Sequence, residues 1–485
     1  MGVIAQDNKT RLLMDQSRSG RRGATIPALD VPRSDLPPDN MLRRELDLPE
    51  LSEPEIVRYF LRLSSMNYSV DTNFYPLGSC TMKYNPKIND EIARLPGFAR
   101  IHPFQPEETV QGALELLHHL QDLLAEITGM DAVSLAPSAG AHGEFSGMLL
   151  FRSYHKSRGD VKRQQILVPD SAHGTNPASA AMAGFEVIEV QSDAEGNTDL
   201  EDLRSKLSDS VAGIMLTMPS TLGLFDPNVE EVCNLVHEAG GLVYGDGANM
   251  NAILGKAKLG DLGFDVVHLN LHKTFSTPHG GGGPGAGPIC VKEPFSRYLP
   301  KPHVEKIGEA YRLVAPEESV GAIGSFLGNF GVLVRAFVYI RTLGADGLRA
   351  VSENAVLNAN YVLARLRDKY FLPYDRSCMH EVVFSANWQK RHGVKALDIG
   401  KRLLDHGFYA PTIYFPLIVE EAMMIELTET ETLETIDEFI DAMLDIAEEA
   451  EKDPDIVIGA PYTTPVIRLD EALAARQPDL RWTER

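Results

Sequence analysis

Five short apolar runs recur between residues 164 and 272, and a stretch long enough for a helix separates most of them from the next. The runs are QQILVPD (164–170), FEVIEV (185–190), AGIMLTMP (212–219), GGLVYGD (240–246) and DVVHLNLH (265–272). Runs of this length that are almost continuously apolar are typical of strands covered on both faces. Strands that alternate with helices predict an α/β fold, in which helices cover a large, mostly parallel sheet.

The chain before these runs predicts a different organisation. Residues 1–100 mix proline and arginine with short polar stretches, so we expect an N-terminal arm and an extended segment there. The large α/β domain is predicted to span residues 101–335, and its first helix should end at Gly129. An apolar helix at GVLVRAFVYIRTLG would join this domain to the rest of the chain.

Residues 336–485 are predicted to form a smaller C-terminal α+β domain and a tail. HEVVFSA and AMMIEL have the composition of strands, and KALDIGKRLLDHG that of a helix. A second helix is expected from about Glu429, where Thr428 and Glu431 have the spacing of a capping box.

Charge and cysteine content exclude several classes of protein. Lys and Arg number 46 against 68 Asp and Glu, and the net charge of −22 argues against nucleic acid and anionic membranes as partners. The four cysteines contain no CxxC pair, which argues against a zinc site and a disulfide scaffold. No apolar run reaches the roughly 18 residues of a membrane span, and the N-terminus lacks a secretory signal pattern. We therefore expect a cytoplasmic protein.

The last apolar run ends in His272 and Lys273 and leads into a glycine-rich loop. Sheets of α/β proteins bind ligands at such strand ends, and a partly desolvated lysine amine there is a good nucleophile toward an aldehyde. An ordinary surface lysine is the alternative. Gly280, Gly282 and Gly285 satisfy the pattern GxGxxG, but the pattern neither follows a strand directly nor opens a helix. We predict a flexible loop there, not a dinucleotide site.

Asp246 ends the preceding run, 273 − 246 = 27 residues before Lys273. One βα step would place its carboxylate beside the lysine amine on an adjacent strand. Pyridoxal phosphate requires this pairing, because the amine binds its aldehyde and the carboxylate keeps its pyridine nitrogen protonated. A turn aspartate before Gly247 is the alternative.

Three other strand ends carry polar groups that suit the same cofactor. Ser138, Ala139 and Gly140 precede an apolar helix, whose first amides could bind a phosphate. His173 could stack on a flat ring, and Thr221 offers a hydroxyl. A plain helix cap at Ser138 and a structural histidine at 173 are the alternatives.

Several motifs together resemble a known family. SAGAHGE, SAHGTNP, PSTLGLF, GDGANMN and HLNLHKTFSTPHGGGGPG occur in this order, and YPLGSCTMKYNP precedes them at residues 75–86. This set resembles the glycine cleavage system P-protein, glycine dehydrogenase (decarboxylating), from about residue 60 to 470. That family has a long single-chain form and a split form. At 485 residues with the lysine present, the chain is similar to subunit 2 of the split form, its catalytic half.

The resemblance implies a fold-type-I enzyme that uses pyridoxal 5′-phosphate. Such an enzyme decarboxylates glycine, transfers the aminomethyl group to the lipoyl arm of H-protein and releases CO2. Lys273 would bind the cofactor's aldehyde, Asp246 would face the ring nitrogen and His173 would stack on the ring, which makes these three the expected catalytic residues. The further cofactor contacts that the resemblance implies are Ser138, Ala139, Gly140, Thr221 and His272.

The resemblance also implies partners. These are glycine, lipoylated H-protein and the homologous P-protein subunit 1, with two copies of each subunit. Because the net charge would repel an acidic carrier, we expect a local basic rim that includes Lys83. Two alternatives stay open: another fold-type-I decarboxylase or hydroxymethyltransferase, and a noncatalytic scaffold subunit. A scaffold would not need Lys273.

Overall fold

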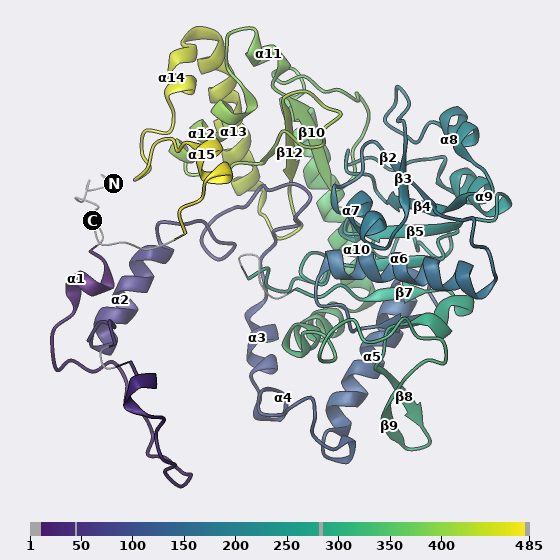
Figure 1. The fold of residues 1–485 in the computed structure, drawn as a ribbon. Helices are drawn as coiled ribbons and strands as arrows, with labels where there is room; N and C mark the ends of the chain where they lie inside the picture. Colours follow the sequence, from purple (N-terminus) through teal and green to yellow (C-terminus); the bar gives the residue numbers. More distant parts are fainter. Residues whose placement is uncertain (1–10, 44–45, 281–284, 481–485) are drawn as a thin grey trace. The chain divides into compact units, whose positions relative to one another are not determined.

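The computed structural model describes residues 11–43, 46–280 and 285–480 (Figure 1). The chain divides into two compact units, one of residues 73–463 and the other of residues 1–72 with 464–485. The predicted division at residues 100 and 335 stays a prediction. Residues 281–284 of the expected glycine-rich loop, including Gly282, lie outside the described residues.

A seven-stranded sheet forms the centre of the larger unit. Its strands are β1 (Ala132–Ser134), β2 (Gln165–Pro169), β3 (Glu186–Val190), β4 (Val211–Thr217), β5 (Leu242–Gly247), β6 (Val266–Leu269) and β7 (Ile289–Val291). Their order is β1-β7-β6-β5-β4-β2-β3, and the five strands from β6 to β3 are parallel. Only β7 runs antiparallel to its neighbours β6 and β1. The five predicted runs are these five parallel strands, so the α/β prediction is confirmed.

Helices cover both faces of this sheet (Figure 1). The helices of this region are α5 (Gln111–Thr128), α6 (Gly140–Ser157), α7 (Thr175–Met182), α8 (Leu200–Lys206), α9 (Val229–Glu238) and α10 (Phe330–Leu366). Alternate strand residues point to opposite faces: Val243 and Val267 pack in the core with α5, α9 and α10, whereas Tyr244 and Val266 pack with α6 and α7. The α10 helix is broken at Gly344, whose φ is 61°.

Two short helices precede α5, and a hairpin follows the sheet. The helices are α3 (Lys87–Ala93) and α4 (Pro96–Ala99), and the hairpin consists of β8 (His303–Ile307) and β9 (Ala310–Val314). Short 3-10 turns lie at Glu107–Thr109, Met250–Ala252 and Glu293–Tyr298. Gly129 ends α5 with φ 70°, as predicted.

A small antiparallel sheet lies in the C-terminal part of the larger unit. Its order is β10-β12-β11, with β10 (Glu381–Ser385), β11 (Thr412–Ile413) and β12 (Ala422–Glu426). The helices of this part are α11 (Asn387–Lys390), α12 (Ala396–Asp405), α13 (Leu433–Lys452) and α14 (Pro454–Gly459). Phe384 and Ile425 of the sheet share a core with Phe439 and Ile440 of α13. The two predicted strands and the α12 helix are therefore confirmed.

The predicted start of the last long helix was wrong by four residues. Thr432 caps α13, because its hydroxyl accepts a hydrogen bond from the Thr435 amide at 3.2 Å. Thr428 is buried and its hydroxyl bonds to that of Thr430 instead.

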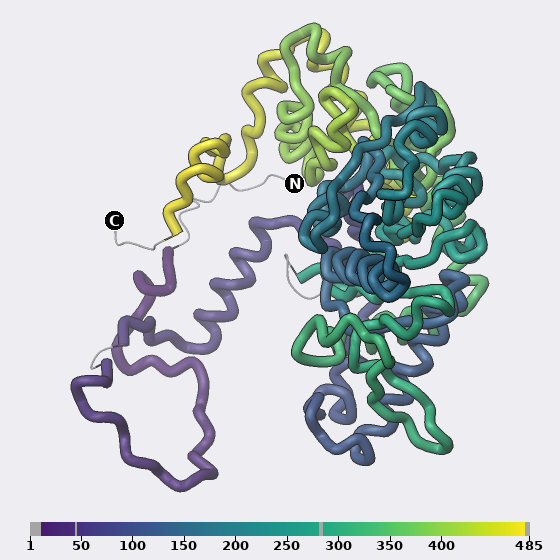
Figure 2. The backbone as a smooth tube through the Cα atoms, turned by 45° about the vertical axis from the view of Figure 1, so that its right-hand side comes forward, coloured from purple at the N-terminus to yellow at the C-terminus, as the bar shows by residue number. Residues whose placement is uncertain are grey.

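The other unit contains α1 (Leu13–Gln16), α2 (Glu53–Ser64) and α15 (Glu471–Arg476), with a 3-10 turn at Asp39–Met41. Between α1 and α2 the described backbone follows an open loop, drawn in purple in Figure 2. The Gly20 amide and the Ser17 hydroxyl both bond to Glu50, which closes the base of this loop. Among the described residues no helix is long and apolar enough to cross a membrane.

Candidate functional site

A cavity of about 160 Å³ lies at the carboxyl ends of β4, β5 and β6. Its lining residues are Ser79, Gly140, Ala141, Glu144, His173, Thr175, Thr217, Thr221, Asp246, Ala248, Asn249, Asn270, His272 and Lys273. Six of the eight predicted site residues are among them; Ser138 and Ala139 are not. The fold therefore brings together side chains from segments up to 194 positions apart in sequence, the separation between Ser79 and Lys273.

Lys273 follows β6 and is partly buried at the cavity wall. Its Nζ donates a hydrogen bond to the Ser79 carbonyl at 2.8 Å. That oxygen belongs to the YPLGSCTMKYNP segment, one of the motifs that carry the family resemblance. The lysine amine is thus held in a defined position at the edge of the cavity.

Asp246 lies near the end of β5, in register with Thr217 of β4 and His268 of β6. Asp246 is 2% exposed. Oδ1 accepts a hydrogen bond from the Ala248 amide at 2.9 Å, and Oδ2 accepts one from the Thr217 hydroxyl at 3.4 Å. These bonds fix the orientation of a buried carboxylate on the strand next to the one that leads to Lys273.

His268 lies beneath Asp246, with Nε2 3.6 Å from Asp246 Oδ1. Burial lowers the pKa of His268 to about 4, so the imidazole is neutral near neutral pH. Tyr244 Oη and Asn270 Nδ2 lie 2.6 and 3.0 Å from its two ring nitrogens. A neutral ring leaves the Asp246 carboxylate without a full opposing charge on this side.

Glu144 is a site residue that the sequence reasoning missed. It points from α6 into the cavity and is 5% exposed. Burial, with the Asp246 charge adding to it, raises the pKa of Glu144 to about 9. In the amide orientation that satisfies its neighbours, Asn176 donates to Glu144 Oε2 at 2.7 Å and to Asp246 Oδ2 at 3.2 Å. The only sequence signal was a carboxylate within an apolar helix.

The predicted phosphate contacts lie at the N-terminus of α6, where Ala139 is the cap and Gly140 the first helical residue. Gly140 lines the cavity, and a Cβ there would collide with Asn270 Oδ1. The Ser138 amide donates to His142 Nδ1 at 3.2 Å, so it is engaged within the loop. An 18-residue helix directs its free amides and the positive end of its dipole toward this part of the cavity.

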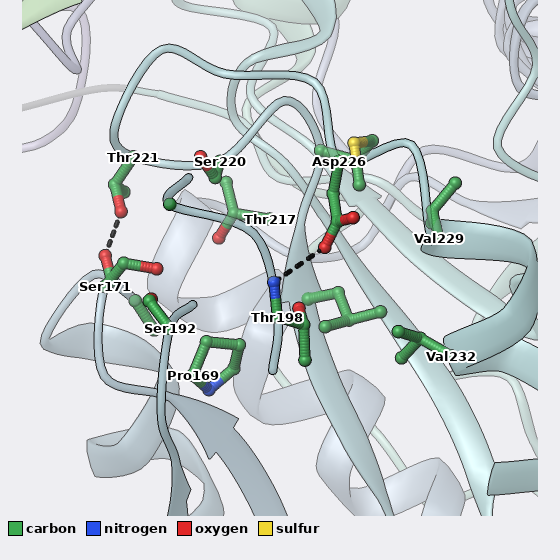
Figure 3. Close-up of a pocket in the computed structure, with 14 residues that line it drawn as sticks. Pro169, Ser171, Ser192, Thr198, Thr217, Ser220, Thr221, Asp226, Val229 and Val232 are labelled. Carbon is green, nitrogen blue, oxygen red and sulfur yellow. Dashed lines mark hydrogen bonds between the residues drawn. The ribbon is translucent and has the colours of Figure 1, made fainter. Parts of the chain in front are cut away.

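His173 and Thr221 also line the cavity. The His173 ring meets the Phe415 ring edge to face, with centroids 5.4 Å apart. His173 is accessible to solvent, yet the surrounding protein atoms lower its pKa. Figure 3 shows the Thr221 hydroxyl bonded to the Ser171 carbonyl, in an adjoining pocket of only about 30 Å³. That pocket has room for little more than a water molecule.

His272 also lines the cavity, and its ring packs edge to face against the His279 ring at 5.3 Å. Burial lowers the pKa of His272 to about 3 and that of His279 to about 4. Both rings are therefore neutral beside the Lys273 amine. His279 Nε2 lies 2.9 Å from the Cys80 carbonyl and ties the two loops together.

The expectation that Lys83 belongs to an exposed basic rim was wrong. Lys83 is 2% exposed, and its Nζ pairs with Glu429 at 2.8 Å and donates to Asn251 and Tyr339. An apolar environment requires a buried ammonium to have such partners. Cys80 is partly buried with a free thiol whose pKa is raised by burial.

The donor set of the cavity fits pyridoxal phosphate. It offers an amine, a buried carboxylate on the adjacent strand, an accessible imidazole ring and a helix N-terminus without a side chain at Gly140. These groups match the aldehyde, the pyridine nitrogen, the ring face and the phosphate of that cofactor.

Comparisons with known proteins place the sequence in a family. The sequence matches the family model of the glycine cleavage system P-protein over residues 29–306, and that of the glycine dehydrogenase C-terminal domain over residues 351–458. It is 57% identical over 478 residues to the probable glycine dehydrogenase (decarboxylating) subunit 2 of Caldanaerobacter subterraneus subsp. tengcongensis, covering 98% of this chain and 99% of that protein. The corresponding protein of Chlorobium chlorochromatii is 59% identical over 475 residues, with 97% and 98% covered.

Solved structures show the same fold. A crystal structure of glycine decarboxylase (P-protein) of the glycine cleavage system, in inhibitor-bound form, matches with a TM-score of 0.72 at 20% identity, covering 84% of this chain and 93% of that one. Glutamate decarboxylase of Lactobacillus brevis matches with a TM-score of 0.65 at 13% identity, covering 86% and 96%. The fold-type-I prediction is confirmed. Since one family model matches more than half of the chain and near-full-length relatives are more than half identical, this chain belongs to the glycine cleavage system P-protein family.

Proposed function

We propose that this chain catalyses the pyridoxal phosphate-dependent decarboxylation of glycine and transfers the aminomethyl group to the lipoyl arm of H-protein, as subunit 2 of a split P-protein. The observation that carries the proposal is the placement of Lys273 and Asp246, whose amine and carboxylate line one cavity. Family membership supports glycine as the substrate, and the relatives bear the name glycine dehydrogenase (decarboxylating). Nothing favours another decarboxylase, a hydroxymethyltransferase or a scaffold.

Each site residue has a part in holding the cofactor. Lys273 would bind the aldehyde, Asp246 would keep a proton on the ring nitrogen, and His173 would stack on the ring. Gly140, with Ser138 and Ala139, would bind the phosphate at the start of α6. Thr221 and His272 would contact the cofactor from the cavity wall.

When bound, pyridoxal phosphate supplies a protonated ring that accepts the electron pair left as glycine loses CO2. The protein's task is to keep that ring protonated. Asp246 can do so because it is buried and, among the residues that the structure describes, accepts its hydrogen bonds from the neutral Thr217 hydroxyl and Ala248 amide, with a neutral His268 nearby. Glu144, with its raised pKa, remains an uncharged acid beside it.

The proposed partners are lipoylated H-protein and the homologous subunit 1, with two copies of each P-protein subunit in the complex. The name of the relatives, subunit 2, supports a companion subunit. The net charge of −22 argues against nucleic acid and anionic membranes. We place the complex in the cytoplasm.

Borohydride reduction of the purified holoprotein, followed by peptide mapping, tests this function. We expect a yellow protein in which reduction fixes the cofactor to Lys273. Attachment to a different lysine, or no bound cofactor, would reject the assignment.

A further inference from the structure

The segment that receives the Lys273 amine has an unfavourable backbone. Ser79 and Thr81 have φ values of 64° and 45°, a left-handed conformation that residues with a Cβ rarely adopt. Such a conformation persists only where surrounding contacts enforce it. The contacts that enforce this backbone conformation also bear on the cavity, because Ser79 carries the carbonyl to which Lys273 Nζ donates.

Two buried glutamates hold this turn. The Ser79 amide donates to Glu381 Oε2 at 2.8 Å, and the Thr81 amide donates to Glu426 Oε2 at 2.7 Å. Glu381 on β10 and Glu426 on β12 are direct partners in the register of the small sheet. Both are at most 1% exposed. Two amides two residues apart are thus fixed by carboxyl groups from neighbouring strands.

Further bonds attach the same segment to the small sheet and to the lysine loop. The Thr412 hydroxyl donates to the Gly78 carbonyl at 2.8 Å, and Leu77 pairs with Ile425 of β12. A Cβ on Gly78 would collide with Met424, so the backbone lies directly against β12. From the other side, His279 contacts the Cys80 carbonyl. The turn therefore connects the small sheet to the wall of the cavity.

We infer that Glu381 and Glu426 are positioning residues, which hold the Ser79 carbonyl where the Lys273 amine docks before it meets the cofactor. Ser79 is the link, because its amide binds Glu381 while its carbonyl accepts from Lys273. This inference rests on the proposed function and assigns to the small sheet a part in preparing the lysine. Neither glutamate lines the cavity, so both act through the turn.

The inference depends on the length of the glutamate side chains and not on their charge. Burial raises the pKa of Glu426 to about 7, and burial together with Glu426 raises that of Glu381. The remaining oxygens, Oε1 of each, face His380 Nε2 at 3.8 and 3.9 Å without a hydrogen bond. An uncharged acid accepts a hydrogen bond from an amide through its carbonyl oxygen, and a glutamine amide does the same.

Two substitutions at each position separate the effect of side-chain length from the effect of the ionisable group. Glu381→Gln and Glu426→Gln keep the length and an acceptor oxygen but remove the ionisable carboxyl group. Glu381→Asp and Glu426→Asp keep the carboxyl group but shorten the side chain by one methylene, which takes the oxygen out of hydrogen-bond range. Glu420→Gln is the control, because Glu420 is exposed just before β12 and pairs with Lys390.

Cofactor-free protein of each variant is mixed with pyridoxal phosphate for a fixed short time, reduced with borohydride and mapped for label on Lys273. The Asp variants should lose roughly tenfold or more of the label, and the Gln variants should stay within about twofold of the unmodified protein. Unfolding midpoints of the cofactor-free variants verify that each is folded.

Equal labelling in all variants would overturn the inference, as would a loss in the Gln variants equal to or greater than that in the Asp variants. A divalent cation bound stoichiometrically by His380, Glu381 and Glu426, detected by metal analysis, would also overturn it, because both carboxylates would then serve the ion. If the unmodified protein carries no label on Lys273, the proposed function itself fails, which distinguishes the two outcomes.

Discussion

At the scale of single residues, the environment of Asp246 determines what the cavity can do. Among the described residues, the Thr217 hydroxyl and the Ala248 amide donate to its carboxylate as neutral groups, and the nearby His268 is neutral because burial lowers its pKa to about 4. These neighbours leave the buried carboxylate free to pair with a cationic group in the cavity. A pyridine nitrogen that must stay protonated is such a group.

We predict that Asp246→Ala gives a folded protein with weakened cofactor binding. Its decarboxylation rate should fall about 100-fold or more, since an electrostatic contact of this kind contributes about 2.7–4 kcal/mol. Asp246→Asn should be almost as impaired, because the amide lacks the charge. Rates and cofactor occupancy are measured on the same samples, and near-normal turnover in either variant would show that this carboxylate does not face the ring nitrogen.

Glu144 should make stability dependent on pH. Its pKa in the folded protein is about 9 against 4.5 for the ordinary group, so between these values the folded state holds a proton that the unfolded state has lost. The stabilising contribution of Glu144 is therefore fully present below pH 4.5 and is lost as the pH rises toward 9. Glu144→Gln should remove this contribution to the slope of stability against pH. The cofactor-free variant should therefore lose less stability between pH 4.5 and 9 than the cofactor-free unmodified chain. Denaturant unfolding at several pH values measures both slopes, and identical slopes would refute the assignment.

At the scale of elements, the sequence predicted strands and helix ends correctly where a single apolar run or a single residue determines them. The five apolar runs predicted five parallel strands, and Gly129 predicted the end of α5. The short strand expected before Ser138 is β1, whereas the three-residue strand β7 was missed, because so short a run carries no period. The cap of α13 was misplaced since Thr428 and Thr432 offer the same hydroxyl, and only burial separates them.

Two glycines of α5 give a matched test of its boundaries. Gly129 has φ 70°, and a Cβ there would lie 3.0 Å from the Lys258 Cβ, so Gly129→Ala should destabilise the protein by about 1–2 kcal/mol. Gly112 lies in the first turn with open space around its Cα, so Gly112→Ala should stabilise by up to about 1 kcal/mol. Denaturant unfolding of both variants measures the difference. Equal effects of the same sign would contradict the assigned end of α5.

At the scale of the whole molecule, the site depends on contacts that no local pattern contains. The strand-end residues were predictable, because a parallel sheet collects its carboxyl ends on one edge. The contribution of Ser79 was not predictable, because Ser79 and Lys273 lie 194 positions apart in the sequence. The contribution of Glu144 was not predictable either, because its helix directs the side chain into the cavity. Lys83 was misassigned for the same reason, because its partner Glu429 lies 346 positions away.

The smaller unit exposes apolar side chains that a partner could cover. Phe60 and Leu61 of α2 are 54% and 62% exposed, and Ile26 in the open loop is 88% exposed. We expect Phe60→Glu with Leu61→Glu to weaken the complex with subunit 1 by at least about tenfold. The same change at Leu357, an exposed residue of α10, is the control and should have no effect. Light scattering of the mixed subunits gives the mass, and an unaltered complex in the double variant would exclude α2 from the interface.

The measurement that tests the central claim most directly is the exchange of labelled CO2 into the carboxyl group of glycine. The assay is run with this chain alone, with subunit 1 added, and with subunit 1 and lipoylated or unlipoylated H-protein. We predict strong exchange only when both subunits and lipoylated H-protein are present, and almost none when Lys273→Ala replaces the unmodified chain. Full exchange by this chain alone, or none in the complete mixture, would contradict the account.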